Sequence, residues 1–182
     1  MNSPPSSSES SPTVAQQVEA LMHLPGSLCK QRGICCRVAT FRGLATPQDL
    51  ATLAQEASPL GDHARAFASI FEPYPTVQAV QAIAPEFVAR VAQKAQEKGQ
   101  SLENIGFYRC RFVLDDGRCG VHEDRPSGCR GYPVVHQNTL FHPGCGYENA
   151  VASQWKALDA LLKDHFGMGA DALLAQSTPE IT

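Results

Sequence analysis

The sequence predicts an α+β fold that is predominantly helical, with one short β-hairpin and cysteine-rich segments dominated by loops. Three observations predict this class. Apolar residues recur at helical spacing through most of the chain, and β-forming residues flank a single "DDG" turn. Seven cysteines lie in two blocks that are rich in Gly. With 182 residues, 43% of them hydrophobic, the chain is long enough for one domain with a sizeable core.

The two ends of the chain are expected to be tails. Residues 1–13, "MNSPPSSSESSPT", are rich in Ser and Pro, and we expect them to be disordered. This stretch also lacks the basic and apolar regions of a secretory signal. Residues 177–182 form a second tail. Residues 14–176 are expected to form a single domain, in which cysteine blocks at 29–36 and 110–145 are joined by a helical scaffold.

Helices are expected in the first half of the chain at three places. "TVAQQVEALMHLPG" has apolar residues on one helical face and ends at Pro25-Gly26. "ATPQDLATLAQEAS" begins with Thr46 as N-cap, Pro47 at the first helical position and Asp49 two positions later. "DHARAFASIF" is a third helix, which starts at Asp62 and stops at an "EPYP" turn.

The middle and the end of the chain are also predicted to be helical. "TVQAVQAIAPEFVARVAQKAQEKGQS" reads as two helices that meet near Pro85, with Gly99 as the C-terminal cap. No catalytic or ligand spacing occurs within 46–100, which indicates a scaffold. "YENAVASQWKALDALLKDHFG" is a long helix whose apolar face holds Val151, Trp155, Leu158, Leu162 and Phe166. A short "ADALLAQ" helix follows it.

The hairpin constrains the cysteines beside it. A tight turn at Asp115-Asp116-Gly117 makes Cys119 face Val113. In a regular hairpin Cys110 then lies about 10 Å from Cys119, at about 3.3 Å per residue. One tetrahedral zinc needs its sulfurs within about 4 Å of each other. The chain must therefore bend between these cysteines, or they serve different centres, or the centre is a larger iron–sulfur cluster.

The cysteines suggest a chemistry. Without an export signal they would lie in a reducing compartment, where structural disulfides are rare, and an odd number fits complete pairing badly. Thiolates select soft metals, so the loop-dominated segments are predicted to form a metal site that holds an iron–sulfur cluster or Zn²⁺. Redox thiols and buried structural cysteines are the alternatives. The candidate ligands are Cys29, Cys35, Cys36, Cys110, Cys119, Cys129 and Cys145.

Three pieces of the chain resemble a known family. "CKQRGICCR", "CRFVLDDGRCGVHEDRPSGCRGYP" and the placement of Cys145 are similar to the motifs of the YkgJ-like, or CxxCxxxxCC, proteins. That family is described as zinc- or iron-chelating, so the resemblance implies that the cysteines bind a metal. Arg32 stands where the family has its second cysteine, which leaves seven thiol ligands instead of eight. Another group then completes the site, or only a core subset of cysteines binds.

Several other residues are candidates for a supporting shell around the metal. The positions of Arg125 and Arg130 in the family motif suggest that their guanidinium groups neutralise thiolates. Arg32 is a further candidate, Tyr132 would cover the centre as an aromatic lid, and His142 lies three residues before Cys145. The alternative for the arginines is a solvated face, and for the histidine a role in packing.

The predicted function is a cytoplasmic, cysteine-ligated metal-binding protein with a structural, metal-handling or electron-transfer role. The net charge of −3 gives no reason to expect nucleic acid as a partner, and no apolar run is long enough to span a membrane. An unidentified protein partner stays open. Flagellin lysine-N-methylases contain a similar cysteine domain, so an enzyme is one alternative. However, no strand followed by a Gly-rich loop suggests a site for S-adenosylmethionine. A thiol-redox module is the other alternative, although the chain has no C-x-x-C.

Overall fold

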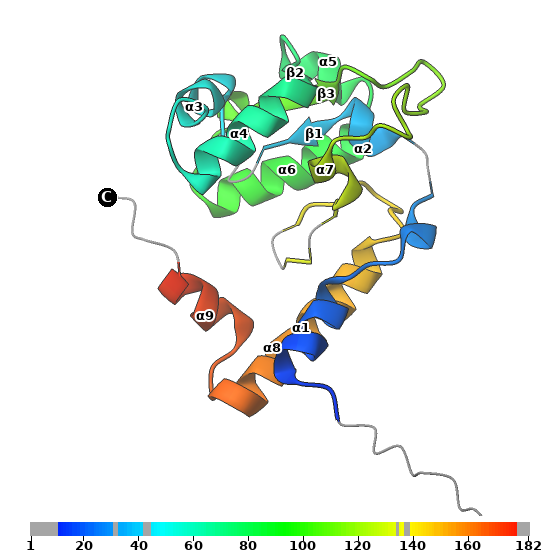
Figure 1. The fold of residues 1–182 in the computed structure, drawn as a ribbon. Coiled ribbons are helices and arrows are strands. Elements are labelled where there is room, and N and C mark those ends of the chain that lie inside the picture. The colour runs from blue at the N-terminus through cyan, green and yellow to red at the C-terminus, as the bar shows by residue number, and fades with distance from the viewer. Residues whose placement is uncertain (1–10, 31–32, 42–44, 134, 137–138, 178–182) are drawn as a thin grey trace, which may run out of the picture. The chain divides into compact units, whose positions relative to one another are not determined.

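The computed structural model describes residues 11–30, 33–41, 45–133, 135–136 and 139–177. The chain is mostly helical and has one small antiparallel sheet, which confirms the predicted α+β class (Figure 1). It divides into two compact units, which we describe separately. The cysteine unit comprises residues 29–133 and 140–146, and the helical unit comprises residues 1–28, 134–139 and 147–182. The expectation of a single domain over 14–176 stays a prediction.

A three-stranded antiparallel sheet lies in the cysteine unit. Its order is β1 (Ala39–Thr40), β3 (Phe107–Cys110) and β2 (Phe71–Pro73), so β3 is central. Ala39 pairs with Tyr108, and Phe71 pairs with Cys110. The "EPYP" segment was expected to be a turn, and this is wrong for its first two residues, which belong to β2. Proline is tolerated there because β2 is an edge strand.

Adjacent residues of β3 point to opposite faces of the sheet and build two core clusters. Phe107 packs in a cluster with Phe87, Val88 and Val91 of helix α6 (Pro85–Glu97). Tyr108 packs on the other face, in a cluster with Phe41, Leu50 and Ala64 that also contacts Phe67. Leu50 comes from α3 (Pro47–Leu53), and Ala64 and Phe67 come from α4 (Pro59–Ile70). The sheet is thus covered by a helix layer on each face.

The caps of these helices explain where they begin. Thr46 and Asp49 form the two reciprocal hydrogen bonds of a capping box at α3, which confirms the predicted start. Helix α4 begins at Pro59, three residues before the expected Asp62, because the Ser58 hydroxyl accepts a hydrogen bond from the Gly61 N–H. The remaining short helices of this unit are α2 (Ile34–Arg37), α5 (Val77–Gln81), η3 (Leu102–Asn104) and α7 (Ser127–Arg130). Helices α5 and α6 meet near Pro85 as predicted.

The helical unit contains α1 (Val14–Met22), η1 (Gly26–Leu28), α8 (Glu148–Phe166) and α9 (Ala170–Ser177). The α1 segment is tied to α8 by the amide of Gln154, which donates to the His23 carbonyl at 3.1 Å. Of the apolar face expected on α8, Val151 and Leu158 are buried, whereas Phe166 is 58% exposed. Among the helices of the described residues, none has the length and hydrophobicity needed to cross a bilayer.

Candidate metal centre

Two glycines bring the two cysteine blocks together. Gly33 precedes Cys35 and Cys36 and has φ +66°, and Gly117 precedes Cys119 and has φ +86°. A Cβ placed on Gly33 would lie 2.0 Å from the carbonyl oxygen of Gly117, so the two backbones touch without intervening side chains. The Arg37 guanidinium also donates to the main-chain carbonyl of Asp115. Gly33 and Gly117 are visible in the sequence beside the cysteines, but nothing there indicates that they meet.

Strand pairing supports the same juxtaposition. Because β1 and β3 are antiparallel, the chain that precedes Ala39 lies beside the chain that follows Tyr108. The first of these segments is α2, which carries Cys35 and Cys36, and the second is Cys110 at the end of β3. The adjacent cysteines lie on a helical turn, where they need not face opposite ways as they would in a strand. Their side chains form a hydrogen bond with each other.

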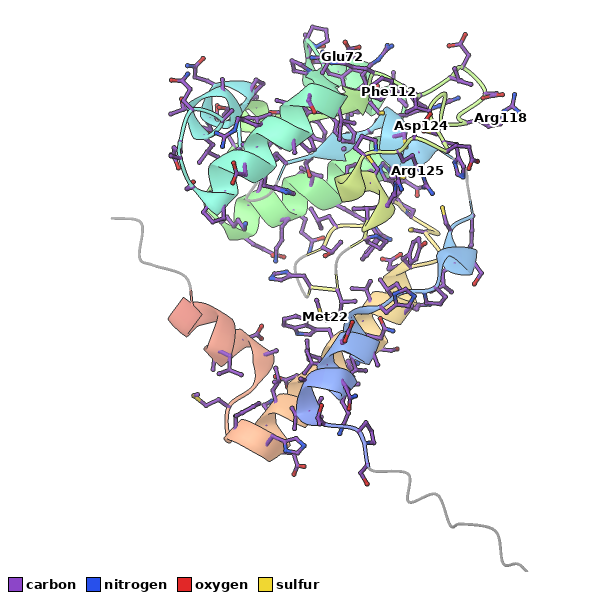
Figure 2. The ribbon with its side chains drawn as sticks, in the orientation of Figure 1. Met22, Glu72, Phe112, Arg118, Asp124 and Arg125 are labelled. Atoms are coloured by element: carbon purple, nitrogen blue, oxygen red, sulfur yellow. The ribbon has the colours of Figure 1, made fainter. Side chains whose placement is uncertain are left out.

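The segment from Cys110 to Cys119 is a hairpin-like turn with one isolated bridge and not the predicted β-hairpin, because β3 pairs with β1 and β2 instead. The turn closes with the Leu114 N–H donating to the Arg118 carbonyl at 2.9 Å, and Val113 faces Cys119 in an isolated bridge, as predicted. Residues 111 and 112 form a turn, in which the Val113 N–H donates to the Cys110 carbonyl at 3.4 Å. The chain therefore bends between these cysteines, which is one of the three alternatives and leaves the other two open. Arg118 extends from this hairpin into solvent (Figure 2).

Five cysteines interact electrostatically, and we call this group the thiol cluster. Its members are Cys35, Cys36, Cys110, Cys119 and Cys129. The hydrogen bond with Cys35 raises the pKa of Cys36 far above its ordinary value. Burial raises that pKa further, and so does repulsion from the neighbouring thiolates Cys35, Cys110 and Cys119. Burial is the main cause of the raised pKa values of Cys110 and Cys129, and other members of the cluster add to both. The cluster joins sulfurs from both blocks.

Hydrogen bonds and one arginine oppose these increases. The N–H of Phe112 donates to the Cys110 sulfur at 3.4 Å and acts to lower the pKa of that thiol. Arg125, labelled in Figure 2, is half-buried, and its positive charge acts to lower the pKa of Cys129. Arg130 is exposed and donates from Nε to the Arg125 carbonyl at 2.6 Å, so it fixes the loop around Arg125. Arg125 therefore interacts electrostatically with Cys129, and its role as a supporting charge for a metal stays a prediction.

Tyr132 lies next to the cluster and connects it to Cys145. Although 47% of the residue's surface is exposed, desolvation at the hydroxyl end raises the pKa of Tyr132. The thiols of Cys35, Cys145 and Cys36 raise it further by repulsion. The phenol thus interacts electrostatically with cysteines of both blocks, and its role as an aromatic lid stays a prediction.

His142 fixes the segment that carries Cys145. Its side chain is buried. The centroids of its ring and the Phe87 ring are 3.8 Å apart, with an angle of 20° between the ring planes. Its Nε2 atom is 2.8 Å from the Val38 carbonyl oxygen. Because a carbonyl only accepts, Nε2 carries a hydrogen and donates. The Arg90 guanidinium donates to the neighbouring Phe141 carbonyl at 3.0 Å. His142 therefore packs against α6 and orients the chain three residues before Cys145.

One expected ligand differs from the other cysteines, and one expected site residue lies outside the described residues. Cys29 is exposed, whereas the other six cysteines are buried or half-buried. Arg32 lies outside the described residues, so the structure does not place the residue that occupies the family's second cysteine position. The thiol cluster of the described chain thus comprises five cysteines, and Cys145 interacts with Tyr132 beside it.

The donor set suits a soft metal in its chemistry. The thiols raise one another's pKa values. A bound cation would lower those pKa values, because it favours the deprotonated form of each ligand. Within the described ranges, no three His, Cys, Asp or Glu side chains are already spaced to hold an ion. Metal binding would therefore require side-chain rotation as well as loss of protons.

Comparisons with known proteins were made at three levels. No family model matches the chain, no curated protein matches it, and no solved structure matches it. The interpretation of the site therefore rests on its own residues.

Proposed function

We propose that this protein binds a soft metal through cysteine thiolates, as an iron–sulfur cluster or as Zn²⁺, in the cytoplasm. The observation that carries this proposal is the convergence of five thiols from two sequence blocks that lie more than seventy residues apart. A chain that only buried its cysteines as small hydrophobes would have no reason to gather them at one place. The role is structural, metal-handling or electron-transferring, and the similarity to YkgJ-like motifs agrees with it.

The number of thiols bears on the kind of centre. Four ligands complete a tetrahedral zinc site, and five thiols exceed that number. The turn at residues 111–112 removes the objection that a regular hairpin would hold Cys110 and Cys119 too far apart for one metal. A single zinc, a zinc pair and an iron–sulfur cluster are all compatible with the thiols of this unit.

We favour ligation over a thiol-redox module because the chain has no C-x-x-C, the usual motif of thiol oxidoreductases. The pKa values of Cys36, Cys110 and Cys129 are raised. These thiols become thiolates when a metal displaces their protons. The enzyme alternative has no comparable observation in its favour.

The experiment that tests this proposal is expression and purification under anaerobic conditions, followed by metal analysis, acid-labile sulfide measurement and visible absorption. Iron with sulfide and a charge-transfer band would identify a cluster, and zinc in a colourless protein would identify a zinc site. A folded protein that contains no metal, and that takes up neither zinc nor iron when these are supplied, would refute the proposal.

A further inference from the structure

A cavity in the cysteine unit is not used by the thiol cluster. Its volume is about 260 Å³. Ile83, Val113 and Leu114 form an apolar wall, and Arg37, Tyr74 and Arg109 contribute polar groups. The cavity therefore combines two cationic side chains with an apolar surface, which is the combination that an amphipathic small molecule requires.

Arg109 is held in place by a residue outside the cavity lining. Its Nε lies 3.0 Å from the Glu72 carboxylate, and both side chains are about half exposed. Glu72 is labelled in Figure 2 on strand β2. The closest atom of the guanidinium in this ion pair is Nε, and not the edge formed by Nη1 and Nη2. That edge presents two parallel N–H groups, which match the two oxygens of a carboxylate.

Arg37 contributes a second cation, whose hydrogen-bond partner is uncharged and whose charge is also felt by the Asp116 carboxylate. Its guanidinium donates to the main-chain carbonyl of Asp115, so this contact does not neutralise it. The Tyr74 hydroxyl donates to the Arg37 carbonyl at 2.7 Å and so fixes the backbone that carries this guanidinium. Asp115 is the one acidic residue among those found to line the cavity, which two arginines also line.

The charged side chains around the Tyr74 hydroxyl have a net positive effect on it. Burial raises the pKa of Tyr74, whereas Arg109 and Arg37 act to lower it. Each arginine has a larger effect than Glu72, which acts to raise it. An anion placed beside Tyr74 would thus be attracted despite the nearby Glu72.

We propose that this cavity binds a small organic carboxylate with a short apolar chain. The carboxylate pairs with the Nη edge of Arg109 and with the Arg37 guanidinium, and the chain lies on Ile83, Val113 and Leu114. Arg37 directly follows Cys36, and Arg109 directly precedes Cys110, so the ligand would bind next to the thiol cluster. The proposal depends on the arginines and not on a metal.

The test is a titration of the full-length protein with hexanoate, followed by calorimetry and by NMR chemical shifts. We expect hexanoate to bind at least tenfold more tightly than hexanamide, because the amide has the same chain but no charge. Inorganic phosphate, an anion without a chain, is expected to bind more weakly than hexanoate. Failure of hexanoate to bind at millimolar concentrations, or equal binding of hexanamide or phosphate, would overturn the proposal.

Variants test the assigned residues. Arg109→Gln is expected to weaken hexanoate binding at least tenfold, whereas Arg111→Gln, which removes an exposed cation outside the cavity lining, should leave it unchanged. Leu114→Ser should weaken hexanoate binding but not acetate binding, and because Leu114 is 46% exposed this change should not prevent folding. Circular dichroism confirms that each variant is folded. Unchanged hexanoate affinity in folded Arg109→Gln would overturn the proposal.

Discussion

The backbones of Gly33 and Gly117 are in direct contact, with the Cβ position of Gly33 only 2.0 Å from the Gly117 carbonyl oxygen. Both residues have positive φ, a conformation that L-residues with a side chain rarely adopt. The contact joins the turn before Cys35 and Cys36 to the turn before Cys119. This approach of the two turns therefore depends on the absence of a side chain at Gly33.

Gly33→Ala is expected to destabilise the protein strongly. The added methyl group meets the Gly117 carbonyl, and the left-handed backbone is strained as well, so we expect the free energy of unfolding to fall by about 3 kcal/mol. Urea denaturation measures this change. We also expect the metal content of the purified variant to fall, because the two cysteine blocks move apart.

The matched control is Gly99→Ala. Gly99 has nearly the same φ, +67°, and no atom lies within 4 Å of its Cβ position. This variant carries only the backbone strain, which costs about 1 kcal/mol. If both variants lose the same stability, the contact between Gly33 and Gly117 does not matter and the interpretation of the site's assembly is wrong.

Cys110→Ser and Cys29→Ser are expected to differ in metal binding. Cys110 is buried within the thiol cluster, whereas Cys29 is exposed. Serine has nearly the shape of cysteine but is a poor ligand for a soft metal. We expect Cys110→Ser to lose most of the bound metal and Cys29→Ser to keep most of it, as measured by metal analysis of the purified proteins. A larger loss from Cys29→Ser would show that the centre is built differently.

His142→Ala is expected to loosen the segment that carries Cys145. The change removes the ring that stacks on Phe87 and leaves the Val38 carbonyl without its donor. We expect the free energy of unfolding to fall by about 2–3 kcal/mol. We also expect Cys145 to react faster with iodoacetamide, as measured by mass spectrometry of the metal-free protein, with exposed Cys29 as the internal reference.

His122→Ala is the control for this prediction. His122 is exposed, so its removal should change the free energy of unfolding by less than about 0.5 kcal/mol. It should also leave the reactivity of Cys145 unchanged. An equal reactivity of Cys145 in His142→Ala and in the unmodified chain would contradict the role assigned to His142.

Tyr108→Phe is expected to increase stability, and the gain should depend on pH. The Tyr108 hydroxyl is buried and has no hydrogen-bond partner among the described residues. Burial, with a smaller effect from Asp49, raises the pKa of Tyr108 from 10.0 to about 12. Removing an unsatisfied hydroxyl should stabilise the protein by about 1 kcal/mol at neutral pH.

The sign of the pH dependence follows from this shift. The folded state holds the phenol proton more tightly than the unfolded state. The contribution of this ionisation to the free energy of unfolding is therefore complete below pH 10.0 and decreases as the pH rises towards about 12. The stability difference between Tyr108→Phe and the unmodified protein should therefore widen over this interval. A difference that stays constant from pH 9 to 12 in urea denaturation would contradict the raised pKa.

The sequence predicted the elements whose signals are local. The capping box of Thr46 and Asp49, the break at Pro85 and the turn at Asp115–Gly117 each depend on residues within a few positions of one another. The strands β1 and β2 were not predicted. They are two and three residues long, too short to show an alternating pattern, and they exist because β3 offers pairing partners on both sides.

The sequence by itself determined the longer helices, the turn and the chemistry of the thiol donors, because these properties belong to single residues or to short segments, whereas the short helices α2 and α7 fall in segments that were expected to be loops. Only the tertiary structure decided which sulfurs meet. The approach of Gly33 to Gly117 and the pairing of β1 with β3 join segments far apart in the chain, and such contacts depend on how two core clusters pack on opposite faces of one strand. The arginine-lined cavity arises in the same way, since its walls come from separate elements that the fold alone brings together.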